Sequence, residues 1–134
     1  MDSLVRNRHS VLLVDDDPAF VYTHERVLQR AGYRVATATS FLDALEMVSV
    51  PSDPFDVLIA DVVLDEGSGF ALTRMTRSLL EHTRPLYVTG YDVPLDDAMG
   101  PVLRKPLTPE TLVAAVDDLL RNVPRRPESP LATS

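Results

Sequence analysis

Chemically active side chains follow four apolar runs of this sequence, each at the point where a run ends. Asp15 and Asp16 follow the first run, Asp61 follows the second, Thr89 ends the third, and Lys105 follows the fourth. If these runs are neighbouring parallel strands, their carboxyl ends meet at one edge of a sheet. Three carboxylates, a hydroxyl and an ammonium would then share one pocket, which suits a divalent cation and a phosphoryl group.

The crowded carboxylates predict a Mg²⁺ site, because like charges at one place stay ionised only beside a cation. Asp16 and Asp61 are the best candidates for direct ligands, since Mg²⁺ prefers oxygen donors and keeps several waters. Asp15 is expected to bind the ion through a water or to orient the other ligands. The backbone carbonyl of Val63 completes the predicted ligand set.

Asp61 is also the candidate nucleophile, because it stands alone after its run and an aspartate can form an acyl phosphate. Phosphoryl transfer depends on positioning and on neutralising the charge of the oxygens. Mg²⁺, the ammonium of Lys105 and the hydroxyl of Thr89 could each take one phosphoryl oxygen. Taken singly, the acids could be helix caps and Lys105 a solvated charge, but their joint placement favours one site.

Composition restricts the classes of protein to consider. The chain has 134 residues, of which 45% are apolar, so one domain with a full core is expected. It has no cysteine, which excludes disulfides and thiolate metal sites. A net charge of −7 argues against nucleic acid as a direct partner. No signal peptide or membrane-spanning run is visible, so we expect a cytoplasmic protein without a membrane partner.

Strand and helix patterns alternate along the chain. Apolar runs predict strands at residues 10–14, 33–38, 56–60, 85–89 and 101–104. Helical spacing predicts helices that begin near Pro18, Phe41, Phe70 and Pro109, with Leu42, Met75 and Leu79 among the expected core residues. Residues 61–69 and 90–100 are expected to be loops.

This order of elements predicts an α/β fold. Helices should cover both faces of a doubly wound, flavodoxin-like sheet of five parallel strands in the order 2-1-3-4-5. The predicted domain spans residues 10–122. A flexible lead-in is expected at residues 1–9, and a disordered proline-rich tail at residues 123–134.

Four motifs carry a resemblance to a known family: Val-Leu-Leu-Val-Asp15-Asp16-Asp17-Pro18, Asp61, Thr89-Gly90 and Lys105-Pro106. Over residues 10–122 the chain closely resembles the receiver domain of two-component response regulators. The resemblance implies that Asp61 accepts a phosphoryl group from a phosphohistidine on a sensor histidine kinase or histidine phosphotransfer protein. It also implies Mg²⁺ at Asp15, Asp16 and Asp61, with Thr89 and Lys105 sensing the phosphoryl group.

Three departures from the family pattern accompany the resemblance. Val102 stands where the family usually has an aromatic switch residue, three places before the lysine. Residues 90–100 are fewer than usual, which predicts a shortened or missing fourth helix. Asp65 stands where many members have proline; with Glu66 it either tunes the site or forms an ordinary solvated turn. Thr89-Gly90-Tyr91 is similar to the branch whose fourth strand reads Phe-Ala-Thr-Gly-Tyr, many of which are single-domain receivers.

The predicted function is a single-domain phosphoacceptor that switches a protein-binding surface, formed by residues 90–107 and the last helix, for a downstream protein target. Such a protein is not an enzyme beyond its own phosphorylation and dephosphorylation. Three alternatives remain: a phosphate sink or relay module, a receiver that has lost the chemistry and only binds, and a haloacid-dehalogenase-type phosphatase. The phosphatase would need a second acid two residues after the nucleophile, where this chain has Val63.

Overall fold

The computed structural model of the chain describes residues 9–49, 54–121 and 123. Most of the predicted lead-in and tail therefore lies outside the described residues. His9 is buried, and its carbonyl accepts a hydrogen bond from the Arg34 amide at 3.0 Å. Among the described residues, no helix has the length and apolar character needed to cross a bilayer.

Five parallel strands form the central sheet, in the order β2-β1-β3-β6-β7. They are β1 (Ser10–Val14), β2 (Arg34–Ala38), β3 (Val57–Asp61), β6 (Arg84–Thr89) and β7 (Val102–Arg104). The register pairs Val14 with Ala60 and Asp61 with Val88, so the carboxyl ends of β1, β3 and β6 are level with one another. This order confirms the predicted 2-1-3-4-5 topology.

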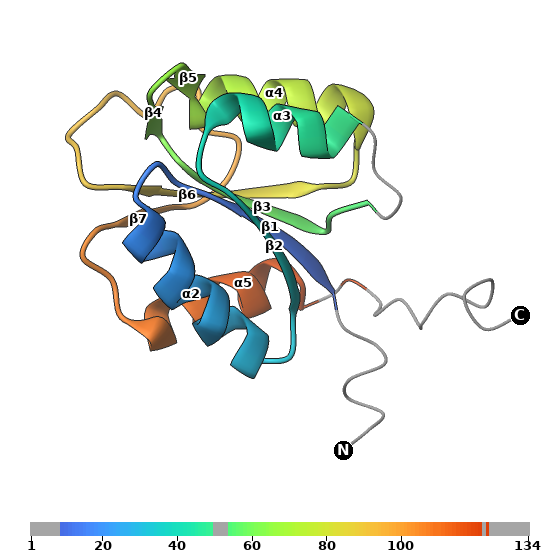
Figure 1. Cartoon of the computed structure of the whole chain (residues 1–134), viewed down its shortest axis with the longest axis vertical. Coiled ribbons are helices and arrows are strands. Elements are labelled where there is room, and N and C mark those ends of the chain that lie inside the picture. Colours follow the sequence, from blue (N-terminus) through green and yellow to red (C-terminus); the bar gives the residue numbers. More distant parts are fainter. Residues whose placement is uncertain (1–8, 50–53, 122, 124–134) are drawn as a thin grey trace, which may run out of the picture.

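Helices cover both faces of the sheet (Figure 1). They are α2 (Pro18–Arg30), α3 (Phe41–Ser49), α4 (Gly69–Leu79) and α5 (Pro109–Leu119). α3 and α4 lie together on one face, and α2 and α5 lie together on the other. The doubly wound arrangement that was expected from the alternation of elements is confirmed.

Polar caps start the helices where the sequence predicts them. The side chain of Asp17 accepts a hydrogen bond from the Ala19 amide, and Thr108 accepts one from the Thr111 amide. These caps satisfy amides that have no partner within the first helical turn. Gly32 follows α2 with φ of +101°, a left-handed conformation that glycine adopts without steric cost.

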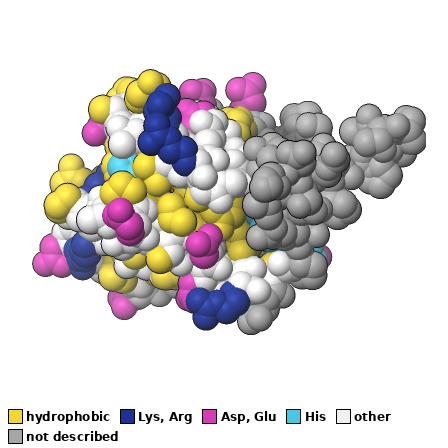
Figure 2. Space-filling view, turned by 90° about the horizontal axis from the view of Figure 1, so that it is seen from below, with side chains coloured by type: hydrophobic (Ala, Val, Ile, Leu, Met, Phe, Trp, Pro, Cys, Tyr) yellow, Lys and Arg dark blue, Asp and Glu magenta, His cyan; other side chains and the backbone are white. Residues whose placement is uncertain are grey.

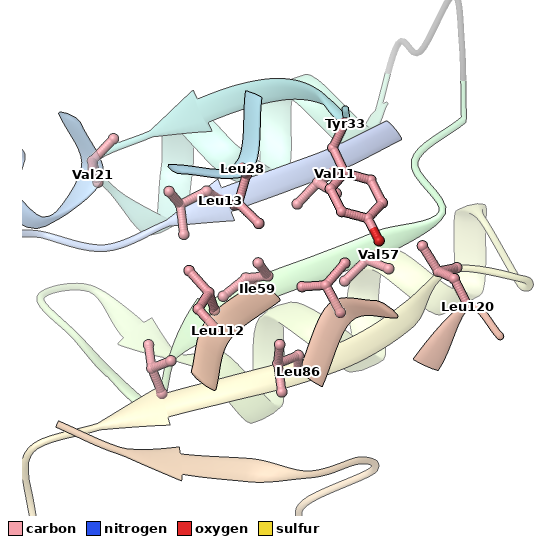
Figure 3. Close-up of a cluster of buried hydrophobic side chains, with 12 residues drawn as sticks. Val11, Leu13, Val21, Leu28, Tyr33, Val57, Ile59, Leu86, Leu112 and Leu120 are labelled. Carbon is pink, nitrogen blue, oxygen red and sulfur yellow. The ribbon is translucent and has the colours of Figure 1, made fainter. Parts of the chain in front are cut away.

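Two apolar cores, one on each face of the sheet, bury the central strands β1 and β3 completely. Figure 3 shows the first core, in which Leu13 and Ile59 from the strands meet Leu28 of α2 and Leu112 of α5. A second core packs the alternate strand residues against α3 and α4. Burial on both faces explains why β1 and β3 read as continuous apolar runs.

Three residues predicted for the core are exposed instead. Leu42 is 56% exposed, Met75 is 41% exposed and Leu79 is 53% exposed. The prediction was wrong for Leu42 because α3 buries Phe41, Ala44 and Val48 instead. It was wrong for Met75 and Leu79 because α4 turns a narrower stripe toward the sheet than its apolar residues suggested. Leu72 and Thr76 occupy that stripe and are fully buried.

The segment predicted as a loop over residues 61–69 contains a small antiparallel hairpin. It joins β4 (Val63–Leu64) to β5 (Gly67–Ser68), with Val63 opposite Ser68. The hairpin turns at Asp65 and Glu66, close to the carboxyl edge of the sheet. Its strands are too short for an alternating pattern to reveal them.

Residues 90–101, all of which the structure describes, contain no helix, as predicted from their small number. The segment instead covers Tyr87 and Phe70, whose rings meet edge to face at 5.0 Å. The Met99 amide donates a hydrogen bond to the Tyr87 hydroxyl at 3.3 Å. Val102, at the usual aromatic position, packs against this third cluster.

On the face of the molecule in Figure 2, the charged side chains of the described residues are not grouped by sign. On the face in Figure 2, the basic side chains of the described residues stand apart from one another among acidic ones. Nucleic-acid backbones bind to continuous basic patches. The described residues of the face in Figure 2 provide no such patch.

Candidate functional site

The predicted site residues meet at the carboxyl edge of the sheet. Asp15 and Asp16 follow β1, Asp61 is the last residue of β3, Thr89 is the last of β6, and Lys105 follows β7. Parallel strands in register bring their ends together, so residues far apart in the chain become neighbours. The edge lies where strand order reverses between β1 and β3.

Lys105 connects two of the acids. Its Nζ lies 2.6 Å from Asp15 Oδ2 and 2.9 Å from Asp61 Oδ2, and its side chain is only 23% exposed. Burial alone would lower the pKa of Lys105, but the hydrogen bonds to Asp15 and Asp61 outweigh it and raise that pKa. The lysine is therefore an ammonium held between two buried carboxylates.

The ring of Phe20 lies under the ammonium of Lys105, 4.4 Å from Nζ. An aromatic face attracts a cation and helps to hold it in position. The Lys105–Pro106 peptide bond is cis. The contact with Phe20 was not predicted, because helical spacing alone marks Phe20 only as a core residue.

Asp61 is buried, and its backbone is tightly enclosed. Its Oδ1 accepts a hydrogen bond from the Val63 amide at 3.0 Å, so both carboxylate oxygens have a donor. Gly69 begins α4 beside it, and a Cβ at Gly69 would lie only 2.4 Å from the Asp61 carbonyl oxygen. Only glycine fits there. No sequence pattern indicates this role, because Gly69 lies far along the loop from Asp61.

Asp15 is 2% exposed and has a second donor besides Lys105. Its Oδ1 accepts a hydrogen bond from the Asp17 amide at 2.9 Å. Burial raises the pKa of Asp15, although the hydrogen bonds from Lys105 and Asp17 oppose the rise. Asp15 therefore orients Lys105 and the start of α2 as well as contributing charge.

Asp16 has the least satisfied carboxylate of the site. Its Oδ1 is buried and has no hydrogen-bond partner among the described residues. Burial raises the pKa of Asp16, and repulsion from the nearby carboxylate of Asp65 raises it further. A carboxylate oxygen buried without a donor is costly, and this oxygen is able to accept a donor or a cation.

Thr89 is fully buried and points its hydroxyl toward the following loop. The hydroxyl accepts a hydrogen bond from the Tyr91 amide at 3.1 Å and donates a long one to the Tyr91 carbonyl at 3.4 Å. Arg104 donates to the same carbonyl at 2.8 Å. The structure thus brings Thr89 to the predicted edge, but its hydroxyl is engaged with the backbone of residue 91.

The oxygen atoms at this edge of the sheet are of the type that Mg²⁺ binds. Three carboxylates and a backbone carbonyl are hard ligands, and the buried Oδ1 of Asp16 lacks any partner that a cation would displace. Within the described residues, however, no three acidic or histidine side chains converge as a metal site. The ammonium of Lys105 lies between Asp15 and Asp61, where it contacts one oxygen of each.

Comparison with protein families decides what kind of domain carries this site. The family of the response regulator receiver domain matches residues 11–117. The chain is a response regulator receiver domain. Acceptance of a phosphoryl group is the general function of this family in two-component signalling.

Relatives of this receiver domain are longer signalling proteins. The chain is 32% identical over 118 residues to the sensor kinase CckA of Brucella abortus, and covers 12% of that protein. It is 34% identical over 117 residues to the response regulator MprA of Mycobacterium ulcerans, and covers 50% of it. Each match includes 83% of this chain. The receiver domain therefore spans half or less of the length of these curated relatives.

Solved structures share the fold. The chemotaxis response regulator CheY4 of Vibrio cholerae is 30% identical with a TM-score of 0.76, and the match covers 84% of this chain and 99% of that chain. A response regulator from Burkholderia pseudomallei, solved with a phosphorylated aspartic acid, calcium ion and citrate, is 27% identical with a TM-score of 0.71. That match covers 85% of this chain and 75% of the other.

Proposed function

We propose that Asp61 is the phosphoacceptor of this receiver domain and that its acyl phosphate switches a protein-binding surface. The double contact of Lys105 carries the proposal, because one ammonium lies within 2.9 Å of both Asp61 and Asp15. A buried carboxylate can act as a nucleophile toward phosphorus. A cation beside it then neutralises the negative charge of the acyl phosphate that forms. The family function and the phosphorylated aspartic acid in the related Burkholderia pseudomallei structure support this assignment.

In the proposed reaction, an oxygen of Asp61 attacks the phosphorus of a phosphohistidine on a sensor histidine kinase or histidine phosphotransfer protein. The O–P bond forms as the N–P bond breaks, and the departing imidazole keeps the electron pair and takes a proton from solvent. Each carboxylate oxygen of Asp61 accepts one hydrogen bond, from Val63 or Lys105, so each keeps a lone pair for the attack. Lys105 and Thr89 then hold phosphoryl oxygens.

Asp15, Asp16 and Asp61, with the carbonyl of Val63, would hold Mg²⁺ in this proposal. The bound ion would neutralise the oxygens of the transferred phosphoryl group. Lys105 now binds an oxygen of Asp15 and one of Asp61. A bound cation would therefore share these carboxylates with Lys105 or displace it from one of them.

Thr89 would transmit phosphorylation to the surface through Tyr91. A phosphoryl oxygen carries more negative charge than a carbonyl, so it attracts the Thr89 hydroxyl more strongly than the Tyr91 carbonyl does at 3.4 Å. When the hydroxyl turns, Arg104 is left as the side chain that holds this carbonyl. The surface formed by residues 90–107 and α5 then changes, and a downstream protein target would recognise it.

Intact-protein mass spectrometry after treatment with acetyl phosphate tests the assignment of Asp61. The wild type should gain one phosphoryl group in the presence of Mg²⁺ and none with a chelator. Asp61→Asn should gain none under either condition. Asp96→Asn removes an exposed acid from the loop before β7 and should be phosphorylated like the wild type.

Phosphorylation of Asp61→Asn to the wild-type extent would overturn the assignment. If the wild type gains no mass, the same variants should be tested with a phosphorylated histidine phosphotransfer protein as donor. A wild type that remains unphosphorylated there would indicate a binding module without phosphoryl chemistry. Rapid transfer back to the donor, with no protein that binds only the phosphorylated form, would favour the phosphate sink or relay.

A further inference from the structure

Two stacked rings on α2 lie next to the ammonium of Lys105. Phe20 and His24 are four residues apart, so their side chains lie on the same face of the helix. Their rings are stacked, with 4.0 Å between the ring centroids and 27° between the ring planes. The centroid of the Phe20 ring lies 4.4 Å from Lys105 Nζ. Contacts thus connect His24, through Phe20, to the ammonium at the carboxyl edge of the sheet.

His24 is the member of this pair that the helix holds in place. It is only 9% exposed and belongs to the buried stripe of α2 with Val21 and Leu28. Its Nδ1 lies 2.8 Å from the Phe20 carbonyl, and because a carbonyl can only accept, this nitrogen donates the hydrogen bond. Burial and this bond fix the orientation of the imidazole, so it presents a flat surface to the Phe20 ring.

Lys105 needs such support because its other contacts are the ones that the reaction changes. Its side chain has a flexible four-carbon stem, and its two ion pairs are with Asp15 and Asp61. In the proposed reaction Asp61 becomes an acyl phosphate, and the ammonium must move to a phosphoryl oxygen. The Phe20 ring is uncharged and binds neither a metal ion nor a phosphoryl group, so its contact with the ammonium can persist through phosphorylation.

We infer that His24 and Phe20 are positioning residues for Lys105: the imidazole holds the Phe20 ring, and the ring holds the ammonium beside Asp61. The effect of this pair on phosphorylation rests on the proposed function, whereas its effect on the position of Lys105 does not. An aromatic face attracts a cation most strongly where water is excluded, and the Lys105 side chain is only 23% exposed. Reactive groups are placed most accurately when packing and hydrogen bonds fix the residues that support them.

Lys105 is the only lysine of the chain, so its surroundings can be measured directly by NMR of protein labelled with ¹³C-lysine. The face of the Phe20 ring should shift the protons of the Lys105 stem upfield. Phe20→Leu should move these signals toward those of a free lysine, whereas Phe20→Tyr keeps the ring and should preserve them. Phe55→Leu is the matched control, because it makes the same change at a partly buried residue just before β3, at the opposite edge of the sheet. It should leave the signals unchanged.

Variants of His24 test whether stacking fixes the Phe20 ring. His24→Leu removes both the flat surface and the hydrogen bond, so the Lys105 signals should move in the same direction as in Phe20→Leu but less far. His24→Phe keeps an aromatic ring in the stack and should give signals close to those of the wild type. His82→Leu is the control, since the His82 side chain is 94% exposed, and it should leave the signals unchanged.

Phosphorylation by acetyl phosphate in the presence of Mg²⁺ gives the functional readout. Phe20→Leu should react about 5-fold more slowly than the wild type, which is the loss expected for one partly buried contact between a cation and an aromatic ring. Phe20→Tyr and Phe55→Leu should react at the wild-type rate. Thermal unfolding of each variant separates this effect from lost core packing, which would lower the melting temperature of Phe20→Leu and Phe55→Leu alike.

The outcomes separate this inference from the proposed function. Wild-type Lys105 signals in Phe20→Leu, or a wild-type rate of phosphorylation despite shifted signals, would overturn the role of Phe20. Equal signals in His24→Phe and His24→Leu would overturn the role of His24. If the wild type accepts no phosphoryl group while Phe20→Leu still shifts the Lys105 signals, the proposed function fails and the placement of Lys105 by Phe20 stands.

Discussion

At the amino edge of the sheet, polar side chains that join two elements have partners. Thr83 donates to the Phe55 carbonyl at 2.6 Å, Asp56 accepts from the Ser10 amide at 2.8 Å, and Tyr33 donates to Asp117. At the carboxyl edge, the single ammonium of Lys105 pairs with Asp15 and Asp61. Asp16 and Asp65 have no ion-pair partner among the described residues, and one oxygen of Asp16 has no donor there. These three groups at the amino edge are satisfied, whereas the carboxyl edge keeps an excess of negative charge.

This difference shows where the molecule holds its structure and where it can change. Satisfied hydrogen bonds stabilise one arrangement, because breaking any of them exposes a buried polar group. A cluster of acids without enough positive charge is less stable than the same cluster paired with a cation. A bound cation or a repositioned lysine can therefore lower its free energy. The carboxyl edge is therefore able to respond to ions and phosphorylation while the amino edge remains unchanged. Four substitutions test this comparison, in order of decreasing effect.

Replacement of the one ammonium should have the largest effect. Lys105→Met leaves Asp15 and Asp61 buried without their cation, so it should reduce the free energy of unfolding by about 3 kcal/mol at pH 7 without Mg²⁺. Mg²⁺ should then stabilise the variant more than the wild type, because it no longer competes with the lysine. Urea unfolding with and without Mg²⁺ measures both effects.

The exposed pair Arg121–Asp118 provides the control for Lys105→Met. Arg121→Met should change the free energy of unfolding by less than about 1 kcal/mol, since exposed ion pairs contribute little. Equal losses in the two variants would show that Lys105 is an ordinary surface charge. They would also remove the contrast between the two edges of the sheet.

A change in backbone spacing should have the next largest effect. Gly69→Ala places a Cβ 2.4 Å from the Asp61 carbonyl oxygen, so either α4 or the end of β3 must move. We expect a loss of about 2 kcal/mol in stability and slower phosphorylation by acetyl phosphate. Gly90→Ala is the control at the same edge, because its Cβ would meet nothing closer than 3.9 Å. A Gly69→Ala variant that unfolds and reacts like Gly90→Ala would contradict the proposed constraint.

A substitution at the amino edge should affect stability without affecting function. Tyr33→Phe removes the hydroxyl that donates to Asp117 and should reduce the free energy of unfolding by about 1 kcal/mol. Mg²⁺ binding and phosphorylation should stay at wild-type values, because the carboxyl edge is untouched. Tyr22→Phe, at a residue that is 62% exposed, should leave stability unchanged. Reduced phosphorylation in Tyr33→Phe would show that the two edges are coupled.

The smallest effect is a gain of stability at Asp16. Because the pKa of Asp16 is raised above its ordinary value of 3.8, the folded protein binds this proton more readily than the unfolded chain. Protonated Asp16 therefore stabilises the folded protein relative to its ionised form. This stabilisation is fully present below pH 3.8 and is lost as the pH rises through the raised pKa. Asn does not titrate. Asp16→Asn should melt roughly 2 °C above the wild type at pH 7.5 without Mg²⁺.

The matching measurement at pH 3.5 decides whether ionisation causes this gain. The two proteins should then melt at nearly the same temperature, because most Asp16 side chains are protonated in both the folded and unfolded wild type. A gain of equal size at both pH values would indicate better packing of the amide instead. Mg²⁺ at pH 7.5 should reverse the order, since Asp16→Asn loses a ligand.

Much of the fold could be predicted because the central strands β1 and β3 are buried on both faces. Continuous apolar runs such as Val57–Ala60 are typical of strands covered on both sides, and their alternation with helical patterns restricts the topology. Helix starts were predictable at Asp17 and Thr108 because capping depends on a few adjacent residues. The proximity of Asp15, Asp61 and Lys105 followed from the rule that parallel strands end at one edge.

The remaining features depend on contacts that adjacent residues do not encode. Met75 and Leu79 were expected inside, but α4 turns the side that carries Leu72 and Thr76 inward and leaves them exposed. The roles of Gly69 and Phe20 depend on the distance between elements that are remote in the chain.

The sequence by itself therefore determined the strand order and which residues collect at the carboxyl edge, because burial and parallel pairing follow from residue type and order. Only the tertiary structure decided which charges meet at that edge. It joined Lys105 to Asp15 and Asp61 and left Asp16 beside Asp65 without a counter-charge among the described side chains. Electrostatic interactions vary with distances of a few ångströms, and folding in three dimensions sets those distances.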